Sequence, residues 1–338
     1  MQRRAAFAGI GHVLPDQRVT SAEIEDRLRE GIDDRLMRAG VIESLSGVRE
    51  RRYAPKGTVS SDLAAQAGLR AIENAGLLPG DIDLLIFASA SHDISEPATA
   101  NIVQVKTGCF NASAMDVKNA CNSFVNGLDI ASSMIETGRA TRVLIATGEI
   151  LSPFIDYDIK GVPDLRTKFA ALTLGDAGAA AVLETVESGN RGVYPGKFMT
   201  DGTHWELSTI LAGGTLMIHD FSRGFFECKS SDLQELAVTT LPPVIKDALW
   251  SVGWTIDEVD LVVPHQVSQA VIERIGDIMG VPVDNRVVTV DRYGNTAAAS
   301  IPLALSTAND EGRLTRGDKV LLVGGAAGWS AGVIPIIW

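Results

Sequence analysis

Two distant parts of this 338-residue chain repeat each other, and the repeat restricts the folds that the chain can adopt. The segment "IENAGLLPGDIDLLIFAS" at 72–89 aligns with "LWSVGWTIDEVDLVVPHQ" at 249–266, and Gly76 falls on Gly253, 177 positions later. Each segment reads as the end of a helix, a turn and a buried strand. An α/β unit of this size cannot cover both faces of its sheet alone, so the two copies should pack as one body.

A second pair of segments extends the repeat at nearly the same offset. "ETGRATRVLIATG" resembles "DEGRLTRGDKVLLVGG", and Gly138 falls on Gly312, 174 positions later. Applied to Cys121, the offset of 174 gives Asn295. We therefore expect Cys121 and Asn295 to occupy the same turn in the two copies.

Short apolar runs alternate with helical patterns along the chain. "IDLLIFASAS" and "RVLIATGE" predict strands, whereas "VSSDLAAQAGLRAIENAGL" predicts a helix. Strands that are continuously apolar, rather than alternating, are typical of sheets covered by helices on both faces. The sequence therefore predicts an α/β fold. The copies meet around 185–195, which predicts an N-terminal half at 1–188 and a C-terminal half at 189–338.

Composition excludes several classes of function. The net charge of −12 argues against a protein that binds the phosphate backbone of a nucleic acid. Three cysteines are too few for a disulfide framework and fit a reducing cytoplasm. No apolar run is long enough to span a membrane, and no CxxC, HExxH or P-loop motif occurs. We expect a cytoplasmic protein without a metal or a resident cofactor.

Cys121 is the candidate nucleophile. It stands in "MDVKNACNSFVNGLDIASSMIETG", where a buried strand turns into a helix. The unpaired amides and the dipole of a helix N-terminus stabilise a thiolate, and the same amides can hold an oxyanion. A small, inert core cysteine is the alternative, and position alone does not decide between the two.

His265 strengthens the case for chemistry. It follows the buried strand in "VDLVVPHQVS", at a strand end where α/β sheets usually place their sites. A lone histidine is more often structural. However, Cys121, His265 and Asn295 all fall at turns that the duplication relates, so these turns converge if the halves pack around a pseudo-twofold axis.

These motifs resemble a known family. "DVKNACNSFVNGL", "PHQVS" and "YGNTAAASIPLAL" are similar to the three signature segments of β-ketoacyl synthase III-like enzymes of the thiolase superfamily, and "LTLGDAGAAAVLE" is similar to another. The resemblance implies a five-layered αβαβα fold, usually a homodimer. It also implies that Cys121 takes an acyl group from a CoA or carrier-protein thioester, while His265 and Asn295 stabilise the enolate of the second substrate.

A narrower resemblance concerns the OleA-type acyl-CoA condensing enzymes. "SASHDISEPATANIVQ" and the ending "GWSAGVIPIIW" look more like that group than like the fatty-acid synthases. In that group the glutamate matching Glu96 is a base that enters the active site of the partner subunit. Without the resemblance, Glu96 would read as a solvated carboxylate before a helix.

We therefore expect an acyltransferase that condenses acyl thioesters to a β-keto product. The preferred reaction is a non-decarboxylative Claisen condensation of two acyl-CoAs. Three alternatives stay open: decarboxylative condensation with malonyl-CoA or malonyl-carrier protein, acyl transfer from Cys121 to an oxygen or nitrogen nucleophile, and a non-enzymatic partner subunit. A biosynthetic thiolase would need a second catalytic cysteine near the C-terminus, and the last cysteine is Cys228.

Overall fold

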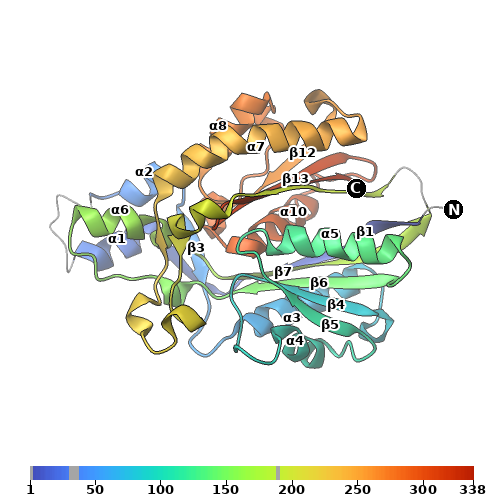
Figure 1. Ribbon diagram of the computed structural model, residues 1–338, viewed down its shortest axis with the longest axis horizontal. Helices are drawn as coiled ribbons and strands as arrows, with labels where there is room; N and C mark the ends of the chain where they lie inside the picture. Colours follow the sequence, from blue (N-terminus) through green and yellow to red (C-terminus); the bar gives the residue numbers. More distant parts are fainter. Residues whose placement is uncertain (1–2, 30–37, 188–190) are drawn as a thin grey trace.

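Two five-stranded sheets form the framework of the protein (Figure 1). The computed structural model describes residues 3–29, 38–187 and 191–338. The first sheet contains, in spatial order, β1 (Arg3–Val13), β7 (Ala177–Glu187), β6 (Arg142–Glu149), β4 (Leu84–Ala88) and β5 (Ser113–Val117). The second contains β12 (Leu261–Pro264), β13 (Lys319–Ala326), β14 (Ser330–Ile337) and, both paired with β14, β8 (Gly192–Val193) and β9 (Lys197–Thr200).

Six helices complete three helical layers around the sheets (Figure 1). The layer between the sheets contains α5 (Ser123–Glu136) and α10 (Ser300–Asp310). The outer face of the first sheet carries α3 (Ser60–Asn74) and α4 (Thr99–Thr107), and that of the second carries α7 (Ser230–Val252) and α8 (Gln269–Met279). The predicted αβαβα order of five layers is therefore confirmed.

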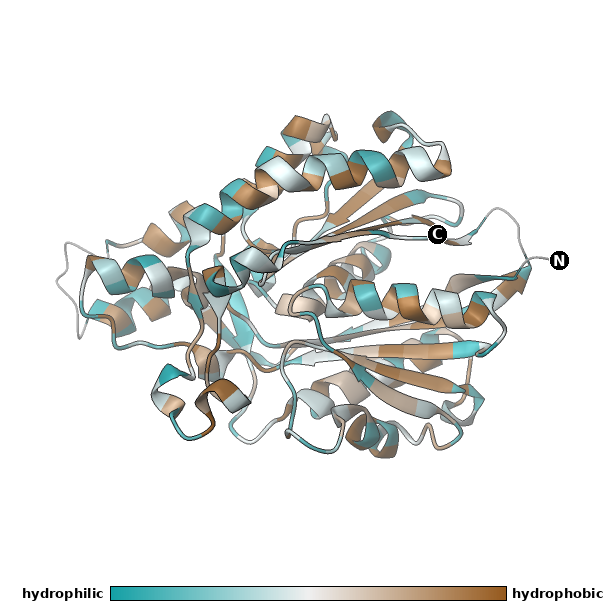
Figure 2. Ribbon diagram, viewed as in Figure 1, coloured by the Kyte–Doolittle hydropathy of each residue, from teal (hydrophilic) through white to brown (hydrophobic). Residues whose placement is uncertain are grey.

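Side chains of each central strand alternate between two cores, because successive residues of a strand point to opposite faces. In β4, Ile86 belongs to the central cluster with α5 and α10, whereas Leu85 and Phe87 pack towards α3. In β13, Leu322 faces the central cluster and Leu321 faces α7. Figure 2 shows the resulting pattern: the strands are hydrophobic along their length, and the outer helices mix hydrophobic and hydrophilic residues.

The duplication predicted from the sequence appears in matching hydrogen bonds. The amide of Asp83 donates to the carbonyl of Arg142 at 3.0 Å, and the amide of Asp260 donates to the carbonyl of Lys319 at 2.9 Å. The carboxylate of each aspartate accepts from the amide of that same partner residue. The two aspartates therefore join the same strand pair, β4 with β6 and β12 with β13, in the two copies.

Cys121 and Asn295 lie in the corresponding turn of the two copies, as predicted, but the offset of 174 that related them is wrong at this turn. Ala120 and Ala297 both have a positive φ, 46° and 43°, and they stand 177 positions apart. At this offset the counterpart of Cys121 is Ala298. The offset of 174 applies only after the central helices, because α5 has 14 residues and α10 has 11. Asn295 belongs to the same turn but lies three residues before the position equivalent to Cys121.

The remaining strands form two separate two-stranded sheets, and four further α-helices occur among the described residues. They are β2 (Gln17–Thr20), α1 (Ser21–Arg29), α2 (Val41–Ser46), β3 (Glu50–Tyr53), α6 (Val162–Lys168), β10 (Ser208–Thr209), β11 (Glu227–Cys228) and α9 (Val290–Tyr293). The first sheet ends with β7 at Glu187 and the second begins with β8 at Gly192. The predicted boundary between residues 188 and 189 lies outside the described residues. Among the described helices, none combines the length and the apolar character needed to cross a membrane.

Candidate active site

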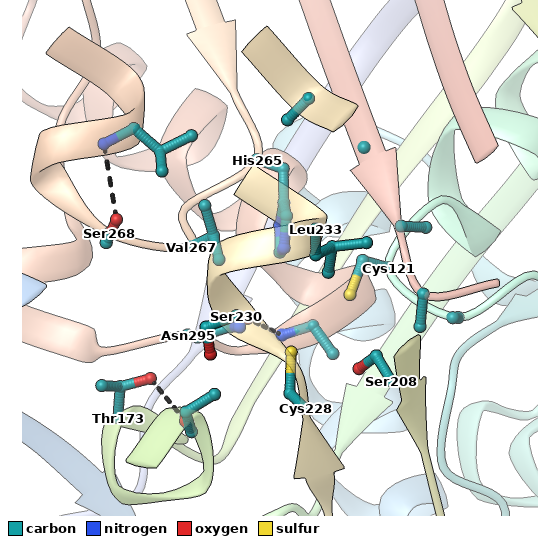
Figure 3. Close-up of a pocket in the computed structure, with 18 of the residues that line it drawn as sticks. Cys121, Thr173, Ser208, Cys228, Ser230, Leu233, His265, Val267, Ser268 and Asn295 are labelled. Carbon is teal, nitrogen blue, oxygen red and sulfur yellow. Dashed lines mark hydrogen bonds between the residues drawn. The ribbon is translucent and has the colours of Figure 1, made fainter. Parts of the chain in front are cut away.

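Three residues predicted from the sequence line one cavity of about 770 Å³. Cys121 lies between β5 and α5, His265 directly follows β12, and Asn295 lies between α9 and the start of α10. Figure 3 shows these three side chains converging on the same space. The nucleophile comes from the N-terminal half, and the two hydrogen-bonding residues come from the C-terminal half.

Local backbone geometry places Cys121 at the start of α5. Ala120 adopts φ 46°, which turns the chain sharply before the helix. The hydroxyl of Ser123 stabilises the turn, because it accepts from the amide of Asn119 at 2.8 Å and donates to the carbonyl of Ala120 at 2.7 Å. The backbone amides of Cys121 and Ala327 are close enough to the Cys121 sulfur to lower the pKa of its thiol. An oxyanion that forms on an acyl group bound to this sulfur would lie beside the same two amides.

The surroundings of Cys121 act on the pKa of its thiol in opposite directions. Burial raises its pKa to about 12, and the nearby charge of Glu149 adds to this rise. The amides of Ala327 and Cys121 act in the opposite direction but do not balance the loss of solvation. The amides at the helix N-terminus therefore remain available to an oxyanion.

Glu149, at the end of β6, is a functional candidate that the sequence analysis missed. Its side chain is fully buried, and it accepts hydrogen bonds from the amides of Ala90 and Ser91 at 2.7 and 3.0 Å and from the Ser91 hydroxyl at 2.7 Å. Burial nevertheless raises the pKa of this carboxyl to about 7. The only sequence signal was an acidic residue ending a continuously apolar strand.

His265 is buried and uncharged at neutral pH. Its amide donates to the carbonyl of Val323 at 2.8 Å, and its ring Nδ1 lies 2.6 Å from the Ser300 hydroxyl. That hydroxyl also accepts from the amide of Gln266 at 3.4 Å, so its own hydrogen is available to Nδ1. This pattern favours the tautomer with hydrogen on Nε2. Burial lowers the pKa of the ring to about 4.

Asn295 is held at both backbone groups and at its side chain. Its amide donates to the carbonyl of Thr173 at 2.9 Å, and its carbonyl accepts from the amide of Gly175 at 3.0 Å. The side-chain Oδ1 accepts from the amide of Ala297 at 3.0 Å, as Figure 3 shows. Because Oδ1 is occupied, Nδ2 is the end of the carboxamide available to a ligand. His265 and Asn295 thus supply two neutral donors.

A side chain next to the nucleophile ties the two halves together. The Nδ2 of Asn122 donates to the carbonyl and to the hydroxyl of Ser330, both at 3.0 Å. Ser330 begins β14, directly after the β13–β14 turn that carries Ala327. A Cβ at Gly324 would lie 2.1 Å from the Asn122 Oδ1, so only glycine leaves room for this tie. The tie fixes the Ala327 amide relative to Cys121.

Glu96 and the two other cysteines, Cys109 and Cys228, lie in three different parts of the structure. Glu96 is exposed on the loop between β4 and α4 and does not line the cavity of this chain. Its predicted role in a partner subunit stays a prediction. Cys109 is buried behind the first sheet, away from the cavity. Cys228 lines the same cavity as Cys121, and Figure 3 shows the sulfur atoms of both residues in that cavity.

The segment at 151–170 forms part of the cavity wall. Its sequence has no clear helical or strand period. Leu151, Phe154 and Phe169 line the cavity, so the segment supplies part of the wall that a substrate would meet. Within the described part of the chain, no group of three or more histidine, cysteine or acidic side chains is arranged to hold a metal ion.

Known proteins resemble this chain over nearly its whole length. The family model for 3-oxoacyl-[acyl-carrier-protein] synthase III matches residues 115–202, and the model for the C-terminal part of that enzyme matches 249–338. The β-ketoacyl-[acyl-carrier-protein] synthase III of Rhizorhabdus wittichii is 34% identical over 337 residues, which cover 98% of this chain and 99% of the relative.

Solved structures agree with the sequence relatives. The 3-oxoacyl-(acyl carrier protein) synthase III of Pseudomonas aeruginosa has a TM-score of 0.89 at 27% identity, over 99% of this chain and 98% of its own. Xanthomonas campestris OleA, solved with lauric acid and lauroyl-CoA, has a TM-score of 0.89 at 28% identity, over 99% of each chain. The predicted thiolase-like fold is thus confirmed. The chain belongs to the 3-oxoacyl-[acyl-carrier-protein] synthase III family, whose members are acyltransferases that condense thioesters.

Proposed function

We propose that this enzyme carries an acyl group on Cys121 and condenses it with a malonyl thioester, with loss of CO2. The observation that carries the proposal is the placement of two amides at the Cys121 sulfur and of two neutral side-chain donors, His265 and Asn295, in the same cavity. The names of the relatives favour this reaction over the non-decarboxylative one that we preferred from the sequence.

The reaction divides into two balanced steps. Cys121 first attacks the acyl thioester, and the CoA or carrier thiol leaves with the thiol proton. A malonyl thioester then loses CO2, and the resulting enolate oxygen receives hydrogen bonds from His265 Nε2 and Asn295 Nδ2. The enolate carbon attacks the acyl-cysteine, whose oxyanion is held by the amides of Cys121 and Ala327. Collapse releases the β-ketoacyl thioester and expels Cys121 as a thiolate, which takes a proton from water to restore the thiol.

Neutral donors suit this chemistry. A protonated imidazole would give up its proton to the enolate carbon and end the reaction before the C–C bond forms. The low pKa of His265, about 4, keeps the ring uncharged through the neutral range. The ring can therefore stabilise the enolate without quenching it.

Condensation of two acyl-CoAs without decarboxylation is the second candidate. The likeness to OleA and the exposed position of Glu96 on the β4–α4 loop favour it. This reaction needs a base to remove a proton from the α-carbon, and a homodimer in which each Glu96 enters the partner's cavity would supply one. The second candidate reaction therefore includes the proposal that the enzyme is a homodimer.

A panel of acyl-CoAs, each incubated with and without malonyl-CoA or malonyl-carrier protein, tests the proposal. Mass spectrometry would follow both the protein and the products, with Cys121→Ala as the control. A β-keto product that forms only with a malonyl thioester supports the first reaction, and a product from acyl-CoAs alone supports the second. Acylated protein that transfers its acyl group to an alcohol or amine, with no C–C product, would contradict both.

A further inference from the structure

Glu149 lies behind the candidate catalytic residues and contacts both halves of the protein. It is the last residue of β6, its side chain is fully buried, and it does not line the cavity. A buried carboxylate needs several hydrogen bonds to offset its loss of solvation. The groups that supply these bonds are the groups that Glu149 holds in place.

The first partners of Glu149 belong to the loop after β4. The amides of Ala90 and Ser91 donate to its two carboxylate oxygens at 2.7 and 3.0 Å, and the Ser91 hydroxyl donates at 2.7 Å. Ala90 and Ser91 both line the cavity. Glu149 thus fixes part of the cavity wall within the N-terminal half.

The other partner of Glu149 belongs to the turn of the C-terminal half that carries Asn295. The amide of Ala298 donates to the Glu149 carboxylate and favours its charged form. The side chain of Asn295 is bound to the same turn, because its Oδ1 accepts from the amide of Ala297 at 3.0 Å (Figure 3). Two successive amides of this turn therefore have fixed acceptors, one in Asn295 and the next in Glu149.

The turn needs such support because its backbone is strained. Ala297 adopts φ 43°, in the left-handed region that alanine rarely occupies. A conformation of this kind persists only where the surrounding structure holds it. A charged acceptor forms a stronger hydrogen bond than a neutral one, and Glu149 provides a charged acceptor at the residue that follows Ala297.

We propose that Glu149 is a positioning residue for Asn295, and that its carboxylate holds the turn at 295–298 so that Asn295 Nδ2 can donate to the enolate oxygen. The inference rests on the proposed function for the task of Asn295. His265, the other donor, provides an internal comparison. Its ring and its amide are held by Ser300 and Val323, and neither of these is a partner of Glu149.

Glu149→Gln tests the proposal. Glutamine has nearly the same size, but it has no charge and only one acceptor oxygen for the four donors. Condensation, measured by rapid-quench mass spectrometry, should be slower by at least about tenfold, up to the 10²–10³ expected for loss of the donor itself. Self-acylation should be at least as fast as in wild type, because the charge of Glu149 opposes formation of the Cys121 thiolate. A general loss of structure would slow both steps.

A double-mutant cycle identifies the residue through which Glu149 acts. In Asn295→Ala protein the donor is already absent, so adding Glu149→Gln should change the remaining condensation rate by less than about twofold. In His265→Ala protein the same addition should slow condensation by its full factor. Equal factors in the two backgrounds, or condensation at the wild-type rate in Glu149→Gln alone, would overturn the proposal.

Glu25→Gln is the matched control. Glu25 is also buried and accepts from two backbone amides, those of Gly40 and Ile42 at 2.7 and 2.8 Å, but it does not line the cavity. Its replacement should leave the ratio of condensation to acylation unchanged. If the thermal melt shows that Glu149→Gln does not fold, Glu149→Asp takes its place in the cycle, since its shorter side chain cannot reach every donor.

Hydrogen–deuterium exchange provides a readout that needs no reaction. Glu149→Gln should speed exchange in the peptide that covers 295–299 and leave exchange at 263–267 as in wild type, whereas Glu25→Gln should change neither. Unchanged exchange at 295–299 would overturn the proposal. Failure of the proposed function would look different: wild-type enzyme would form no β-keto product, while the faster exchange at 295–299 in Glu149→Gln would persist.

Discussion

The side chains of Cys121 and His265 are both uncharged at neutral pH. The neutral state of the Cys121 thiol has a measurable consequence. Because burial raises the pKa of the thiol to about 12, the thiolate fraction should increase about tenfold with each pH unit through the neutral and mildly alkaline range. The rate of alkylation of Cys121 by iodoacetamide, followed by peptide mass spectrometry, should rise accordingly up to at least pH 9. Cys121→Ala protein gives the background from the other cysteines. A plateau below pH 8 would mean that the thiol is activated before substrate binds.

The neutral donors His265 and Asn295 should matter for condensation more than for acylation. Their assigned task is to stabilise the enolate, which forms only in the second step. Removing one donor of this kind lowers the rate by about 10²–10³. We expect His265→Ala and Asn295→Ala to self-acylate and yet to condense slower by that factor, as measured by rapid-quench mass spectrometry of the acyl-enzyme. Wild-type condensation rates in both variants would contradict the assignment. Loss of acylation in His265→Ala would show that the imidazole instead deprotonates Cys121.

At the scale of elements, the tie between α5 and β14 connects the nucleophile to the oxyanion site. Gly324→Ala would place a methyl group against the Asn122 Oδ1, and overpacking of this kind costs about 1–3 kcal/mol of unfolding free energy. It should also slow acylation, because the Ala327 amide would move relative to Cys121. Gly325→Ala is the matched control for stability, since its new methyl group would find its nearest neighbour at 3.7 Å. Urea unfolding of the two variants compares them, and equal midpoints would show that the tie tolerates the methyl group.

The repeat illustrates what the sequence could and could not predict about the elements. Two features of the repeat were visible as patterns in the sequence. They are the αL glycines that end corresponding helices, Gly76 and Gly253, and the buried strands that follow these glycines. Both could be predicted because they depend on local backbone preference and on strand burial. The register at the catalytic turns was not visible. A difference of three residues between α5 and α10 shifts the offset there, and helix length depends on what the helix packs against.

The candidate site was predictable in its residue types but not in its electrostatics. Cys121, His265 and Asn295 lie at the ends of recognisable elements, so their motifs pointed to them. The pKa of Cys121 depends on burial and on Glu149, which is the last residue of a different strand of the same sheet. The hydroxyl that orients His265 comes from Ser300, 35 residues away. Such effects arise only when elements that are separate in the sequence pack against each other within each half.

For the molecule as a whole, Glu96 separates two ways of forming the carbanion. It is exposed in the single chain, and a role in catalysis requires a second copy to bring it to a cavity. We expect Glu96→Gln, which is nearly isosteric, to leave Cys121 acylation and decarboxylative condensation unchanged within about twofold. Condensation of plain acyl-CoAs, if the wild-type enzyme performs it, should be lost in the variant, because only that reaction needs a base. Product analysis by mass spectrometry checks both reactions, and plain acyl-CoA condensation at the wild-type rate would show that Glu96 is not the base.

The central claim is that the two halves together make Cys121 an acyl carrier for C–C bond formation. The most direct measurement is peptide mapping after brief incubation with an acyl-CoA, followed by addition of a malonyl thioester. The account predicts that the acyl mass appears on the peptide containing Cys121, that it disappears on addition of the malonyl thioester, and that an equal amount of β-ketoacyl product forms. Acyl mass on Cys109 or Cys228, or condensation that continues in Cys121→Ala, would contradict the account.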